Sequence, residues 1–153
     1  PIPKEYSDRI RRTMQDDFGH AVEKSIAGEL GSGPCRSCLR QTQPGEERLL
    51  FSYAPVGSDN PYNEVGPVYI HAHACTPYKE VNNFPADVKN GRLPIPLVLR
   101  AYNKEGRMIA AKQVGEQDAE TIIGQLFENQ SIETIHIRNA EVQCFIAAVK
   151  RAN

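Results

Sequence analysis

The sequence predicts an α+β fold with a mostly antiparallel sheet and two main helices. Three observations support this fold class. Segments with strand patterning outnumber helical segments, most connections between them are short, and turn residues join neighbouring strands into hairpins. The chain has 153 residues, the usual size of one domain, and no repeat or linker divides it. We therefore expect residues 1–153 to form a single α+β domain.

Two segments have the spacing of amphipathic helices. The first is expected over residues 8–18, with Ser7 as its N-terminal cap and apolar side chains three to four residues apart. The second is expected over residues 119–129, where Asp118 is the cap and the apolar side chains face one side.

The expected strands are short apolar runs bounded by turn residues. They are residues 35–40, 48–53, 68–75, 97–102, 108–114, 134–138 and 144–150. The stretch Asn103–Gly106 predicts a hairpin between two of them. Residues 76–96 are rich in proline and are expected to form irregular surface structure.

The charge and hydropathy of the chain argue against two classes of partner. A formal net charge of −1 gives no surplus of Lys and Arg for binding the phosphates of a nucleic acid. No apolar run approaches the roughly 18 residues that cross a bilayer, so we expect no membrane association. Partners otherwise stay unknown, and we expect a reducing, cytoplasmic location in which cysteines are thiols or metal ligands.

Several short segments together carry a likeness to a known family. They are Gly33–Leu39, Pro44–Glu46, Gly66–Val68, Leu99–Tyr102, His136–Ala140 and Cys144–Phe145. In this order they resemble a bacterial family known as domain of unknown function 1203, from about residue 30 to residue 150. The family pattern often has Gly before the last Cys, where this chain has Gln143. The resemblance implies a bacterial cytoplasmic protein and no particular reaction.

Chemistry is expected of the cysteines and histidines. Cys35 and Cys38 form a CxxC motif after a Gly-Ser-Gly-Pro segment, and two thiolates at this spacing can bind one zinc ion from a tight loop. If residues 68–75 form one strand, alternation places His71, His73 and Cys75 on the same face. An exposed polar strand face that happens to contain histidine is the alternative.

The last predicted hairpin brings in a further pair, His136 and Cys144. Burial of the apolar side chains of both strands requires these two residues to lie on the opposite face. A loop of three residues, 139–141, would make them a direct cross-strand pair. A loop of two or four residues would separate them onto opposite faces.

Our leading hypothesis is a small zinc-binding protein. Its ligands would be drawn from Cys35, Cys38, Cys75 and Cys144, with His136 or His73 as substitutes. Four protein ligands would make the zinc structural, whereas three with an open water position would make it catalytic, so enzymatic activity is left open.

Three alternatives stay open. A thiol redox or sensor protein would use Cys35 and Cys38 as a dithiol, although little room follows Cys38 for the helix that usually activates such a motif. A non-catalytic interaction module would use the proline-rich segments 55–67 and 76–96. The cysteines would otherwise be small buried apolar residues without chemistry.

Overall fold

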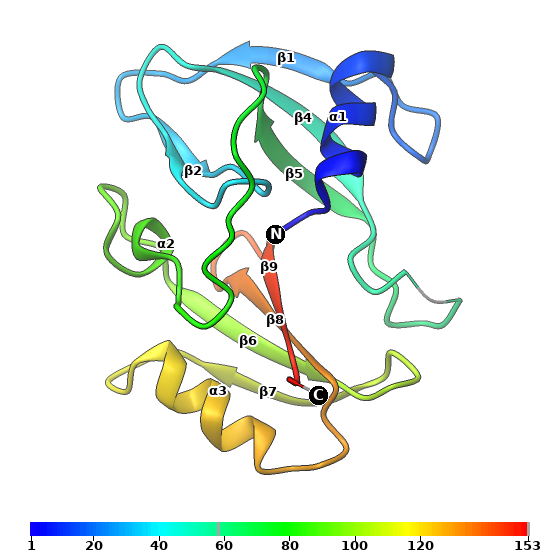
Figure 1. The fold of residues 1–153 in the computed structure, drawn as a ribbon, viewed down its shortest axis with the longest axis vertical. Coiled ribbons are helices and arrows are strands. Elements are labelled where there is room, and N and C mark those ends of the chain that lie inside the picture. Colours follow the sequence, from blue (N-terminus) through cyan, green and yellow to red (C-terminus); the bar gives the residue numbers. More distant parts are fainter. Residues whose placement is uncertain (58, 153) are drawn as a thin grey trace. The chain divides into compact units, whose positions relative to one another are not determined.

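The structure, a computed structural model, describes residues 1–57 and 59–152 (Figure 1). The chain divides into two compact units. One contains Pro1–Tyr53 and Gly66–Ile95, and the other contains Ala54–Val65 and Pro96–Asn153. The expectation of one domain over residues 1–153 stays a prediction.

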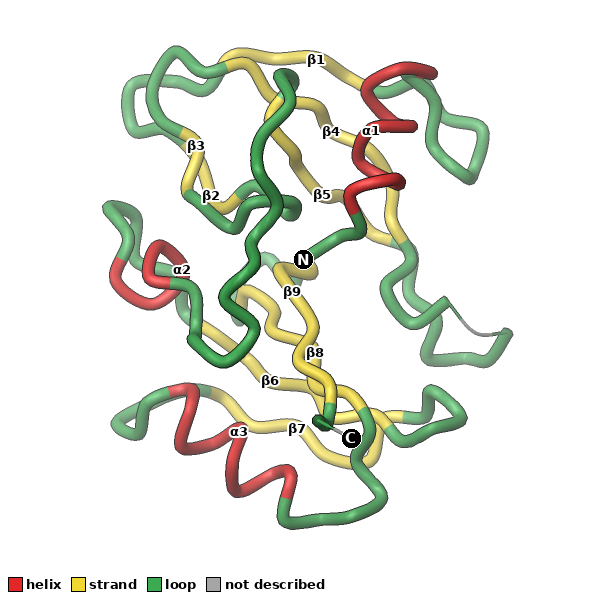
Figure 2. Tube along the Cα trace, viewed as in Figure 1, coloured by secondary structure: helices red, strands yellow, loops and turns green. Residues whose placement is uncertain are grey.

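The first unit contains a three-stranded antiparallel sheet, a two-stranded antiparallel pair and two helices (Figure 2). The sheet has the order β1-β4-β5 and the pair is β2-β3. The elements are α1 (Lys4–Thr13), β1 (Glu23–Ile26), β2 (Ser32–Pro34), β3 (Gln41–Thr42), β4 (Glu47–Tyr53), β5 (Gly66–His71) and α2 (Ala86–Asn90).

Alternation along β4 and β5 builds the core of the first unit. Leu49 pairs with Ile70 and Phe51 pairs with Val68, and all four side chains are buried. Because side chains alternate across a strand, these residues share one face. Ile10 of α1 is also fully buried.

The second unit is a four-stranded antiparallel sheet with one helix. Its strand order is β7-β6-β8-β9. The elements are β6 (Leu97–Tyr102), β7 (Met108–Gln113), α3 (Ala119–Phe127), β8 (Thr134–Asn139) and β9 (Phe145–Lys150). Its buried apolar side chains include Leu99, Ile135 and Ile137. The α+β class with mainly antiparallel sheets is therefore confirmed.

The two main helices are present, but the first begins and ends earlier than expected. Helix α1 follows Pro3, whose φ of −55° suits the start of a helix, and Ser7 lies buried inside the helix instead of capping it. Met14 ends it in the left-handed conformation. In α3 the cap is as predicted, since Asp118 accepts a hydrogen bond from the Thr121 N–H.

Two predicted strands are wrong in ways that matter for the cysteines. Residues 35–40 form a turn between β2 and β3 instead of a strand. The strand predicted over residues 68–75 ends at His71, and a bend follows. Both segments contain cysteines, whose side chains therefore do not follow strand alternation.

The last hairpin forms, but His136 and Cys144 are not a cross-strand pair. His136 pairs with Ala148, and the register shifts between Ile137 and Arg138. Because Arg138 pairs with Phe145, Ile146 is the extra residue of a bulge, which changes the face of every residue beyond it. Gln143 precedes Cys144 with a φ of 61°, a conformation that glycine adopts at less cost than a residue with a side chain.

Among the described residues, no helix combines the length and the apolar character needed to cross a bilayer.

Gly91 lies at the end of α2, where the chain contacts the strand that follows the cysteine turn. Gln41 of β3 donates to the Leu93 carbonyl over 2.7 Å and accepts from the Leu93 N–H over 2.9 Å. A Cβ atom at Gly91 would overlap with the Asp87 carbonyl oxygen and the Gln41 amide. This contact leaves no room for a larger residue.

We expect Gly91→Ala to lower the free energy of unfolding by about 1–3 kcal/mol, since a methyl group there must displace backbone. Urea unfolding followed by circular dichroism measures the loss. Gly115→Ala is the matched control, because nothing lies within 4 Å of its added Cβ. Equal stabilities for the two variants would contradict the crowding at Gly91.

Candidate metal site

The Cys35–Cys38 turn directs two thiols toward one point. The turn is closed by hydrogen bonds from the Leu39 N–H to the Cys35 carbonyl (2.8 Å) and from the Cys35 N–H to the Arg40 carbonyl (2.9 Å). Leu39 adopts a φ of 59°, which is uncommon for a residue with a side chain. The reversal after Cys38 lets the chain enter β3 at once.

The turn is also anchored to its neighbours through the backbone. The Arg36 N–H donates to the Tyr69 carbonyl of β5 over 2.9 Å, and the Ile2 N–H donates to the Arg36 carbonyl over 2.7 Å. The Tyr78 N–H donates to the Ser37 carbonyl over 3.0 Å. Three separate segments thus hold the turn beside the end of β5.

The bend after β5 brings a second pair of side chains to the same point. His71 is the last residue of β5 and is fully buried, and the Ala72 N–H still donates to the Glu47 carbonyl over 2.9 Å. The chain then turns through His73 to Cys75, which is half-buried. Without this bend, Cys75 would lie about four residues farther along the strand, roughly 13 Å from His71.

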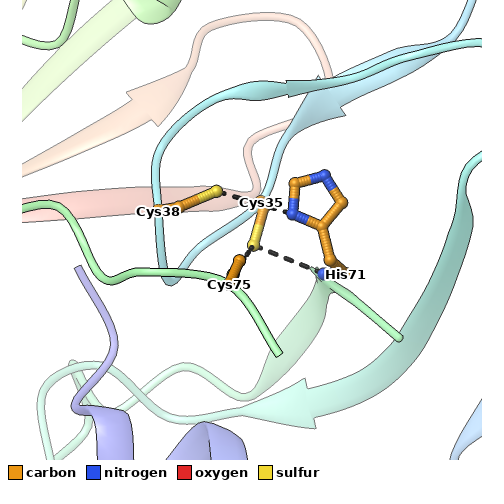
Figure 3. Close-up of side chains that lie close together, drawn as sticks. All are labelled: Cys35, Cys38, His71 and Cys75. Carbon is orange, nitrogen blue, oxygen red and sulfur yellow. Dashed lines mark hydrogen bonds between the residues drawn. The ribbon is translucent and has the colours of Figure 1, made fainter. Parts of the chain in front are cut away.

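The four side chains Cys35, Cys38, His71 and Cys75 form the cluster shown in Figure 3, which we call the Cys₃His cluster. The Cys35 and Cys75 sulfurs are 3.8 Å apart, and the Cys38 sulfur lies 3.5 Å from His71 Nδ1. One ligand atom from each residue lies within 4.8 Å of all the others.

These distances fit a tetrahedral metal centre. With Zn–S bonds of about 2.3 Å and Zn–N bonds of about 2.0–2.1 Å, tetrahedral geometry requires sulfurs about 3.8 Å apart and a sulfur-to-nitrogen separation of about 3.5 Å. The separations between Cys35 and Cys75 and between Cys38 and His71 match these edges. The donor set therefore fits a metal ion such as zinc.

The thiols share protons unequally. Hydrogen bonds from Cys38 and Cys75 lower the pKa of Cys35 far below its usual range, despite burial. The backbone N–H of His71 also donates to the Cys35 sulfur over 3.3 Å. The reciprocal interaction with Cys35 raises the pKa of Cys38. A metal ion needs all three thiolates, so its binding would release the remaining protons.

The electrostatic environment of His71 combines opposing effects. Burial alone lowers its pKa, but hydrogen bonds and Coulombic attraction from Cys35 and Cys75 outweigh burial and raise the pKa to about 10. These interactions favour a proton on the imidazole and negative charge on the Cys35 sulfur. A bound cation would replace the proton on Nδ1, because both need the same lone pair.

A carboxylate lies behind the imidazole. His71 Nε2 is 3.2 Å from Glu46 Oε2, an ion-pair distance without the alignment of a hydrogen bond. Glu46 is itself held by the Gln43 N–H, which donates to Oε2 over 2.8 Å and lowers the pKa of the carboxyl. Metal-binding histidines commonly donate their second N–H to such a group, which fixes the ring orientation.

Two arginines supply positive charge beside the thiols. Arg11 of α1 donates from Nη2 to the Cys75 sulfur over 3.6 Å and from Nε to the His71 carbonyl over 3.1 Å. Coulombic attraction from Cys38 raises the pKa of Arg40. Three thiolates around a divalent cation would carry a net charge of about −1, which these guanidinium groups would offset.

Of the six expected ligands, the structure brings three into the cluster: Cys35, Cys38 and Cys75. His73 is exposed, and its ring stacks on that of His71 with centroids 5.0 Å apart. Cys144 and His136 are not members of the cluster and belong to the second unit. All four cysteines are thiols.

The sequence pattern did not predict His71 as a member of the cluster. Alternation did place His71, His73 and Cys75 on one face, but that face ends where β5 ends. His71 is the last residue of β5, where its side chain can meet the chain that turns back beyond the strand. The end of β5 was not predictable from the apolar pattern.

Comparison with known proteins identifies the family. A family described as "Protein of unknown function (DUF1203)" matches residues 32–151. The chain belongs to this family. The match contains the whole Cys₃His cluster and begins after α1. No curated protein and no solved structure matched.

His136, which is not in the cluster, is buried in the second unit. Its ring lies 4.5 Å from that of Tyr102 and 5.2 Å from that of Phe145, centroid to centroid. Burial lowers its pKa to about 3, with help from the charges of Arg138 and Arg100. The imidazole is therefore neutral at neutral pH.

This shift predicts a pH dependence of stability. The unfolded chain takes up the proton at a pKa near 6.5, whereas the folded chain does so only at about 3. The stabilisation is therefore present above pH 6.5 and is lost as the pH falls toward 3, by up to about 1.4 kcal/mol per pH unit. We expect His136→Phe to reduce this slope in urea unfolding. An imidazole resonance of His136 that titrates near pH 6.5 would contradict this prediction.

Proposed function

We propose that this protein binds one zinc ion through Cys35, Cys38, His71 and Cys75. One observation carries the proposal: four ligand atoms from these residues lie within 4.8 Å of one another, and the Cys35–Cys75 and Cys38–His71 separations match the edges of a zinc tetrahedron. Thiolate and imidazole ligands favour zinc over magnesium or calcium, which take oxygen ligands.

We propose further that the zinc is structural. Four protein ligands fill a tetrahedral site and leave no open position for a water molecule or a substrate. The ion would connect the Cys35–Cys38 turn with residues more than thirty positions farther along the chain. Binding would thereby stabilise the irregular backbone that the sheet leaves unpaired.

A thiol redox function has weaker support. Redox-active dithiols commonly sit at the N-terminus of a helix, which lowers the pKa of the first cysteine. Here Cys35 and Cys38 lie in a turn between β2 and β3. The third thiol and the imidazole also suit a metal ion better than a dithiol exchange reaction. The two hypotheses differ in a measurable way, because bound zinc protects the thiols from mild oxidants.

The proposal predicts the metal content of the purified protein. We expect one zinc per chain by elemental analysis, and a four-coordinate cobalt spectrum with sulfur-to-metal charge transfer after substitution. Cys35→Ser, Cys38→Ser and His71→Ala should each lose at least about tenfold in zinc affinity, measured by competition with a chromophoric chelator. Chelation of the zinc should lower the Tm.

Cys144→Ser is the matched control, since Cys144 is not in the cluster. It should keep full zinc content, whereas Cys75→Ser should not. A folded wild-type protein without metal, whose Tm does not rise on adding zinc, would contradict the proposal. Equal zinc loss in Cys144→Ser and Cys75→Ser would contradict the assignment of ligands.

The carboxylate behind His71 gives a separate prediction. Glu46→Gln keeps the size of the side chain and removes the charge that favours the Nε2–H tautomer. We expect zinc affinity to fall about 10- to 100-fold, with the stoichiometry unchanged. Glu47→Gln is the control, because that exposed neighbour pairs with Lys24 instead. Similar affinities for both variants would show that Glu46 does not orient the ligand.

A further inference from the structure

Charged side chains gather on one face of the sheet in the second unit, a region independent of the proposed zinc site. Arg100 of β6 pairs with His136 of β8, and Arg138 follows two residues later on the same face. Leu99 and Ile137, which point to the other face, are almost fully buried. Two guanidinium groups on a sheet face need an explanation beyond core packing.

The two arginines converge on a single carboxylate, that of Glu64. Arg100 Nη1 donates to both Glu64 oxygens over 2.9 Å, and Arg138 Nη1 lies 2.8 Å from Oε2. Gln143 completes the arrangement: its side-chain oxygen accepts from Arg100 Nη2 and its carbonyl accepts from Arg138 Nη1. The Glu64 side chain is 51 % exposed, whereas the side chains of Arg100 and Arg138 are only 19 % and 5 % exposed.

This arrangement leaves positive charge and donors uncompensated. One carboxylate faces two guanidinium groups, and the Arg138 side chain is only 5 % exposed. Among the described residues, Arg138 Nε and Nη2 have no hydrogen-bond partner, nor does His136 Nδ1. Burying a guanidinium with unpaired N–H groups costs folding free energy. A ligand with more charge and more acceptors than Glu64 would reduce that cost.

We infer that Arg100 and Arg138 form a binding site for a phosphate group, in which Glu64 is an internal occupant that the ligand displaces. The fork of an arginine side chain matches both carboxylate and phosphate. A monocarboxylate would only repeat the contacts of Glu64. Phosphate has a charge near −2 and more oxygens, so it can bridge both arginines and also accept from Arg138 Nη2, the unpaired group beside Nη1.

The test measures phosphate affinity after removal of the internal competitor. Inorganic phosphate is titrated into the purified protein, as isolated, at constant ionic strength and followed by calorimetry. Glu64→Gln should raise the affinity at least about tenfold over wild type, because the competing charge is gone. A parallel titration with glycerol phosphate distinguishes an ester ligand from free phosphate, and acetate serves as the carboxylate probe.

Second substitutions in the Glu64→Gln background assign the gain to the arginines. Arg100→Lys keeps a positive charge but loses the planar fork, and should abolish most of the gain in phosphate affinity. Arg138→Gln should have the same effect, and if that variant does not fold, Arg100→Lys still provides the test. Arg107→Gln removes an exposed arginine of the same unit and should leave the gain intact. No gain in Glu64→Gln, an equal gain for acetate, or an equal loss with Arg107→Gln would overturn the inference. The first result would identify Glu64 as a structural ion-pair partner only, the second would show a carboxylate site, and the third would show a non-specific effect of charge.

Discussion

The convergence of three sulfurs and one imidazole nitrogen on a single point is the constraint around which the first unit is organised. Like-charged thiolates repel one another, so such a cluster is stable only with shared protons or a bound cation. The surroundings of the cluster stabilise it, because backbone N–H groups and two arginines favour negative charge on the sulfurs. This requirement also explains two irregular segments of the backbone. The turn at Cys35 and the bend after His71 bring the four side chains of the Cys₃His cluster together.

The same constraint accounts for features that core packing leaves unexplained. Leu39 adopts a left-handed conformation because the chain must reverse directly after Cys38 to enter β3. His71 is a fully buried polar residue at the end of a strand, where an apolar residue would pack with no desolvation cost. Its two ring nitrogens contact Cys38 and Glu46 instead. Arg11 extends the network to α1, which lies outside the part of the chain matched by the family.

The second unit gathers positive charge, whereas the cluster of the first unit gathers negative charge. Its sheet face holds two guanidinium groups and a neutral histidine, and one half-exposed carboxylate faces them. A bulge at Ile146 brings Phe145 onto this face beside His136, where alternation would have directed it to the other. The chain therefore carries a thiolate-rich cluster in one unit and an arginine-rich face in the other, each built from residues distant in sequence.

Local periodicity and turn chemistry are enough to predict the α+β class, the antiparallel hairpins, the Asp118 cap and the CxxC spacing of two cysteines. Only the tertiary structure decided that Cys75 joins them and that His71 is the fourth member instead of His73, Cys144 or His136. The physical reason is that a strand's end and a bulge are set by hydrogen bonds to other segments. A bulge moved by one residue changes the face of the side chains beyond it, and residues beyond a strand's end leave the alternation altogether.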